Sequence, residues 1–154
     1  MPKRPRLDDL LASRRLQRHS PFPAETGDLL ALAKRQLADA CAAGLSPDGR
    51  FAAAYGAAIT LATAIVCAGG YRVADAPGHQ RLTIELLPVL LGEQQRRGAT
   101  YLDACRRKRN VAEYERAEAT TLAESQALHA AVRELQEEVL TWLAEEHPEL
   151  FGAS

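Results

Sequence analysis

A run of cations followed by an amide and a phenol is the pattern in this sequence that best suits chemistry on a phosphate group. The run is Arg106-Arg107-Lys108-Arg109; Asn110 follows it directly, and Tyr114 lies four residues further along. A guanidinium can donate two parallel hydrogen bonds to phosphate oxygens, and an ammonium group binds phosphate as a point charge. The pattern predicts a phosphate-binding surface, although a charge run on a helix is also typical of a plain solvated face.

The basic run lies in a predicted helix, and helical geometry decides which of its residues act together. Successive residues rotate by about 100° around a helix, so Arg106, Asn110 and Tyr114 form one row and Arg109 lies beside it. Asn110 and Tyr114 are four residues apart, which lets the amide orient the phenol. We expect Arg109 to clamp a phosphodiester, with the other three cations of the run contributing charge.

The elements that must position this set are almost wholly helical, because no convincing alternation of period two occurs along the chain. The fold class predicted is all-α, an up-and-down bundle of about five helices. Caps, prolines and glycines predict where the helices begin and end. The first helix runs from Thr26 to Gly44 and the second from Ser46-Pro47-Asp48 to Gly69-Gly70; the third passes through Leu82 and Leu91 with a kink at Pro88. The fourth begins at Thr100 with Asp103, and the fifth runs from the capping box of Thr121 and Glu124 to His147-Pro148.

The second predicted helix is apolar over a length that could cross a membrane. No charged residue occurs from Phe51 to Tyr71, but eight of those positions are alanine and three are glycine. Small residues favour a central, closely packed helix of a bundle over a leucine-rich membrane span, so we expect no membrane contact. The fifth helix carries an apolar seam at steps of four, three, four and three, formed by Leu128, Val132, Leu135, Val139 and Trp142.

The two ends of the chain differ in charge and in predicted order. Residues 1–25 hold four prolines, and the first twenty residues have six Lys or Arg against two Asp, which predicts a loosely held basic arm. Residues 26–148 make the bundle and residues 149–154 a short tail. From Ala119 onward seven Glu stand against one Arg, so this end is acidic. The N-terminus lacks the apolar core of a signal peptide, and we expect a cytoplasmic protein.

The sequence predicts neither a metal site nor a cofactor. Cys41, Cys67 and Cys105 are an odd number of cysteines without the short spacings of zinc ligands, and we interpret them as buried, reduced thiols. The glycine-rich phosphate loops, zinc-protease helices and serine nucleophile turns of common enzymes do not occur in the sequence.

The helix order, the alanine-rich second helix and the Arg-Asn-three residues-Tyr pattern of the fourth resemble the HEPN domain, in its actinobacterial-type branches of small single-domain proteins. The resemblance covers roughly residues 26–146. In that family the active signature is Arg, commonly followed by a polar residue, and then His four to six positions further on. Arg109 and Asn110 match the first two places, and Tyr114 stands where the shortest version of the signature puts His.

The resemblance implies a homodimer with a groove between the two copies. HEPN ribonucleases are thought to build one metal-independent site from both protomers, where the RNA 2′-hydroxyl attacks the neighbouring phosphate. A histidine can exchange a proton near neutral pH, whereas the pKa of a phenol is about 10. Tyr114 therefore departs from the family's chemistry. His79 and His129, on the third and fifth predicted helices, are possible accessory groups.

Three functions remain open from the sequence. The first is a HEPN-like module that binds RNA, a nucleotide or a partner nucleotidyltransferase through the basic helix, without full ribonuclease chemistry. The second is a toxin-like, metal-independent endoribonuclease that uses Arg109, Asn110 and Tyr114. The third is a helical adaptor that binds a protein partner through its apolar seam and its acidic fifth helix.

Overall fold

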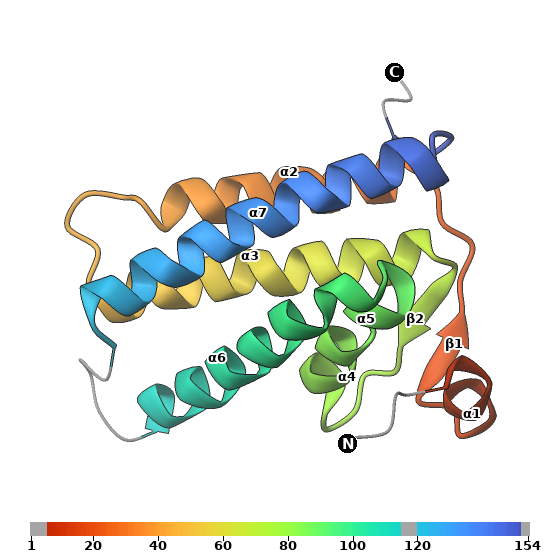
Figure 1. Cartoon of the computed structure of the whole chain (residues 1–154), viewed down its shortest axis with the longest axis horizontal. Helices are drawn as coiled ribbons and strands as arrows, with labels where there is room; N and C mark the ends of the chain where they lie inside the picture. Colours follow the sequence, from red (N-terminus) through yellow and green to blue (C-terminus); the bar gives the residue numbers. More distant parts are fainter. Residues whose placement is uncertain (1–5, 115–119, 152–154) are drawn as a thin grey trace.

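The protein is an all-α helical bundle with one small two-stranded sheet (Figure 1). The computed structural model describes residues 6–114 and 120–151, without the side chains of residues 111–114. The helices are α1 (Leu7–Ala12), α2 (Pro23–Asp39), α3 (Pro47–Ala68), α4 (His79–Glu85), α5 (Leu87–Leu90), α6 (Arg96–Tyr114) and α7 (Leu122–Glu146), with a 3-10 turn η1 at Glu93–Gln95. The strands are β1 (Leu16–Arg18) and β2 (Tyr71–Val73). The predicted fold class is confirmed.

Helix α3 is the central element of the bundle, and α2 and α7 run along its length (Figure 1). Its start is as predicted: the Ser46 hydroxyl accepts a hydrogen bond of 3.1 Å from the Gly49 N–H, and Pro47 occupies the first turn. It ends at Ala68 with Gly69 as its C-cap, and Gly70 then takes a φ of +95°. Within the described residues α3 is the one helix apolar and long enough to span a membrane, and 72% of its apolar window is buried inside the fold.

The main hydrophobic core is formed by α3 with α2, α6 and α7. Alanines Ala54, Ala57 and Ala58 of α3 have no exposed surface, and their short side chains let the neighbouring helices approach closely. On α7 the predicted seam is buried from Leu128 to Val139. The predicted capping box is also confirmed, because Thr121 and Glu124 each accept a hydrogen bond from the other's backbone N–H.

Several helix boundaries differ from the sequence-based expectation. Helix α2 begins at Pro23, so Thr26 is a buried residue of its first turns and not the N-cap. Helix α6 begins at Arg96, before the predicted cap at Thr100, whose hydroxyl instead donates to the Arg96 carbonyl at 3.0 Å. Hydroxyl side chains can bond within a helix as well as cap it, so the residue type alone did not fix either start.

The N-terminal segment is not the loose arm that its prolines and charges suggested, as far as the structure describes it from residue 6. Strand β1 pairs antiparallel with β2, with Leu16 opposite Val73. Leu10 and Leu16 are buried in a second apolar cluster with Val66 of α3, Val73, Leu82 and Leu86. A strand of three residues is too short to show alternation, so β1 could not be predicted from the sequence pattern. At the other end, Leu150 of the predicted tail is buried in the main core.

We predict that Leu16→Ala lowers the free energy of unfolding by about 2–5 kcal/mol, because it leaves a cavity in the second apolar cluster. Leu122→Ala is the matched control, since that leucine is 48% exposed and its truncation should cost under about 0.5 kcal/mol. Urea unfolding followed by circular dichroism measures both. Equal, small effects of the two variants would mean that β1 adds nothing to the stability of the bundle.

Candidate functional site

The basic run on α6 is largely matched by acidic side chains. Arg106 Nε lies 2.9 Å from Asp103 Oδ1, and Arg107 Nε lies 3.5 Å from Asp103 Oδ2. Lys108 Nζ lies 2.9 Å from Glu124 Oε2 at the start of α7. Two arginines thus share one carboxylate, and the lysine connects α6 to α7. The predicted face is therefore less positive than four consecutive cations suggested.

Glu124 is the acidic anchor of this region. Its carboxylate accepts the Thr121 backbone N–H, which is the main reason that its pKa falls to about 2, and the hydrogen bond from Lys108 lowers the pKa further. The group is therefore ionised throughout the neutral range. It serves both the cap of α7 and the ion pair to α6.

Arg109 is held differently from the three cations before it. Its guanidinium carbon lies 5.5 Å from the centre of the Tyr55 ring on α3, which is cation–π distance. The Tyr55 hydroxyl donates a hydrogen bond of 2.7 Å to Gln80 Oε1 of α4. Burial raises the pKa of Tyr55 to about 12, while the nearby Arg106 and Arg109 act against that rise. No carboxylate of the described side chains forms an ion pair with Arg109.

The remaining predicted site residues are only partly brought together. Asn110 is exposed on α6, close to Arg109 in sequence. Tyr114 ends α6, but its side chain lies outside the described part of the structure, so its contact with Asn110 stays a prediction. His129 of α7 lies 3.1 Å from the Leu37 carbonyl and 3.2 Å from Cys41 Sγ, so it faces α2. His79 lines a pocket described below. Neither histidine forms a described hydrogen bond or ion pair with α6.

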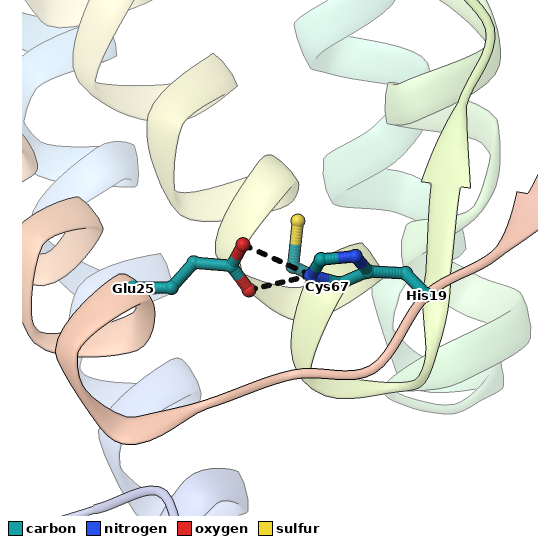
Figure 2. Close-up of side chains that lie close together, drawn as sticks. All are labelled: His19, Glu25 and Cys67. Carbon is teal, nitrogen blue, oxygen red and sulfur yellow. Dashed lines mark hydrogen bonds and ion pairs between the residues drawn. The ribbon is translucent and has the colours of Figure 1, made fainter.

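A second cluster of functional groups lies where β1 leads into α2 and where α3 ends (Figure 2). His19 Nε2 is 2.7 Å from Glu25 Oε1 and 2.9 Å from Glu25 Oε2. One donor atom from each of His19, Glu25 and Cys67 lies within 4.8 Å of the other two. The His19 backbone N–H donates to the Gly70 carbonyl at 2.9 Å, which holds this segment against the end of α3. Arg72 Nη2 lies 3.9 Å from Glu25 Oε2, and the Arg72 side chain is exposed.

Cys67 is buried in the last turn of α3, and its thiol is protonated near neutral pH. Burial raises its pKa to about 11, the negative charge of Glu25 adds to the rise, and Arg72 opposes it. Cys105 of α6 is buried as well, and desolvation raises its pKa. These two cysteines are buried thiols as predicted. Cys41 is exposed, which corrects the expectation that all three would be buried.

A pocket of about 530 Å³ adjoins the His19, Glu25 and Cys67 cluster. Glu25 and Cys67 belong to its wall, together with apolar side chains of α2, α3 and β2. Asp28, Arg72 and His79 add charged and polar groups to the same wall. An apolar pocket with a few convergent polar groups is the usual form of a small-molecule site.

Sequence reasoning missed this second cluster. His19 lies in the segment predicted to be a loosely held basic arm, and Cys67 was interpreted only as a buried, reduced thiol. The positions 19, 25 and 67 have none of the short spacings by which ligand sets are recognised in a sequence. Only the pairing of β1 with β2 brings His19 to the end of α3.

Comparison with known proteins adds no relative. None of the family models, curated proteins and solved structures that were compared with the chain matches it.

We predict that the three thiols differ strongly in reactivity. At pH 7.5 and in the folded protein, a disulfide reagent such as DTNB should modify Cys41 first. Cys67 should react on the order of 100-fold more slowly, because it is buried and only a small fraction is thiolate. Its rate should rise as the pH approaches 11. Cys41→Ser should remove the fast phase alone; a fast phase that survives this change would contradict the assignment.

Proposed function

We propose that the protein is a HEPN-like homodimeric module that binds RNA through the face of α6 around Arg109. The proposal combines the family resemblance of the sequence with the way in which α6 presents its cations. Asn110 is exposed next to Arg109 and adds an amide that can bond to phosphate or sugar.

The observation that carries the proposal is the placement of Arg109. Its guanidinium rests against the Tyr55 ring and has no acidic partner among the described side chains. Contact with an aromatic ring restrains a guanidinium and does not use its N–H donors, which stay available to a ligand. Tyr55 is itself fixed by its bond to Gln80. A guanidinium held in this way is prepared for bidentate contact with a phosphate.

The local charge supports the same ligand. Arg106 and Arg107 share a single carboxylate among the described side chains, that of Asp103. With Arg109 the run therefore keeps a positive excess. Arg107 is exposed and can exchange its long contact with Asp103 for a phosphate. Contacts of this kind give affinity for a nucleic-acid backbone without reading its sequence.

The endoribonuclease alternative has less support from the described groups. A proton acceptor that works near neutral pH is required, and Tyr55, with a pKa of about 12, does not supply one. His129 faces α2 and His79 faces the pocket. Binding of a nucleotide or of a partner nucleotidyltransferase through the same face remains the second candidate, because it would use the same N–H donors of Arg109.

We predict that Arg109→Ala weakens binding of a labelled single-stranded RNA by about 10-fold and reduces the salt slope of the binding constant by about one unit. Arg133→Ala is the control, because this exposed arginine of α7 lies outside the basic run. Fluorescence anisotropy at several salt concentrations measures both variants. Circular dichroism checks that losing the contact with Tyr55 has not unfolded the protein.

The same samples test the alternatives. Equal binding by the Arg109→Ala and Arg133→Ala variants would overturn the RNA proposal and favour the helical adaptor. Incubation with RNA in EDTA should leave the RNA intact. Cleavage that disappears in Arg109→Ala would instead establish the endoribonuclease.

A further inference from the structure

We propose that His19, Glu25 and Cys67 form a binding site for Zn²⁺, with a fourth coordination position that faces the pocket beside them. The three side chains supply an imidazole nitrogen, a carboxylate oxygen and a sulfur atom, each a common zinc ligand. A neutral imidazole, a carboxylate and a thiolate carry two negative charges, which balance the charge of the ion. The inference does not depend on the proposed RNA binding.

The geometry of the cluster is close to that of a metal site. Zinc–ligand bonds of about 2.0–2.3 Å place tetrahedral ligands about 3.3–3.8 Å apart. The donor atoms of His19, Glu25 and Cys67 already lie within 4.8 Å of one another. His19 Nε2 and the Glu25 oxygens, now 2.7 and 2.9 Å apart, would separate by about 0.5 Å around the ion, and the Cys67 sulfur would approach them by up to about 1 Å.

The three ligands stand on elements that are themselves fixed. Glu25 is in the first turn of α2 and Cys67 in the last turn of α3. His19 is held to the end of α3 by its backbone hydrogen bond to Gly70. The C-terminal end of a helix carries partial negative charge on its last carbonyl groups, so the end of α3 favours a cation at this place.

Hydrogen bonding explains the contact between His19 and Glu25, but it does not explain Cys67. Among the described residues the Cys67 sulfur has no hydrogen-bond partner, although it lies beside a carboxylate and an imidazole. A cysteine nucleophile would need a lowered pKa, and the surroundings of Cys67 raise it. A bound metal ion supplies its own compensation, because it deprotonates a coordinating thiol.

The open coordination position of the proposed site faces the pocket. Glu25 and Cys67 are part of its wall, so a zinc ion held by them has one side toward a space of about 530 Å³. Three protein ligands and one open position distinguish reactive zinc sites from purely structural ones. Arg72 and His79 on the same wall can contact an anionic ligand bound to the ion. The arrangement fits a small molecule with a metal-binding anionic group.

The metal site and the Arg109 face are separate parts of the molecule. Cys67 lies twelve residues after Tyr55 on α3, which is about 18 Å along a helix. Neither set of side chains includes a residue of the other. Variants of one site can therefore be tested while the other serves as a check of folding.

The test is a titration of the full-length, reduced protein with ZnCl₂ in competition with a chromophoric chelator. We expect one equivalent of Zn²⁺ to bind. Cys67→Ser should weaken binding by about 100-fold or more, and Glu25→Gln by about 10-fold or more. The matched control is the double variant Cys41→Ser, His129→Asn. It removes a second cysteine and histidine that lie next to each other, with Cys41 Sγ 3.2 Å from His129 Nε2. It should bind like the wild type.

Replacement of Zn²⁺ by Co²⁺ gives a second readout. A sulfur-to-cobalt charge-transfer band should appear with the wild type and be absent with Cys67→Ser, while azide should shift the visible bands by occupying the open position. Thermal melting without metal checks that each variant is folded. The proposal would be overturned if the wild type did not bind one equivalent of Zn²⁺, or if Cys67→Ser and Glu25→Gln bound Zn²⁺ as tightly as the wild type. Loss of binding in the control instead would show an adventitious site at Cys41.

Discussion

The close packing of small residues along α3 is the constraint on which the rest of the structure depends. Alanines without exposed surface allow α2, α6 and α7 to approach this helix, and its larger side chains fill the space between them. Polar side chains then fix the neighbouring helices to α3. The Thr60 hydroxyl donates to Gln36 Oε1 of α2 at 2.8 Å, and Tyr55 bonds to Gln80 of α4 while Arg109 of α6 rests on its ring. Buried polar contacts of this kind favour one arrangement of the helices over others.

Both proposed sites are consequences of that central helix. Near its middle, Tyr55 contacts Arg109, the cation of the basic run that has no acidic partner among the described side chains. At its end, the last turn places Cys67 between the segment that follows β1 and the first turn of α2. Helix α3 thus contacts both the proposed Arg109 surface and the cluster of His19, Glu25 and Cys67.

Features set by residues close in the sequence were predictable, whereas features set by contacts between distant segments were not. Ser46-Pro47 and the capping box of Thr121 and Glu124 were predictable, because the groups that cap a helix are close in sequence. The seam from Leu128 to Val139 was predictable from helical spacing. Strand β1 was not, since three residues show no periodicity and their partner lies more than fifty residues away. The same distance hid the approach of His19 to Cys67. The ion pairs of Asp103 and Glu124 were readable in part, because Asp103 lies three and four residues before Arg106 and Arg107.

The packing of α3 is tested most directly by enlarging one of its buried alanines. Ala58→Leu should lower the free energy of unfolding by about 1–3 kcal/mol, because Ala58 has no exposed surface and the added carbons must displace neighbouring helices. Ala31→Leu on the exposed face of α2 makes the same change in solvent and should alter stability by less than about 0.5 kcal/mol. Urea unfolding of the two variants beside the wild type gives the difference. Equal stability of both variants would show that α3 is not the tightly packed centre of the bundle.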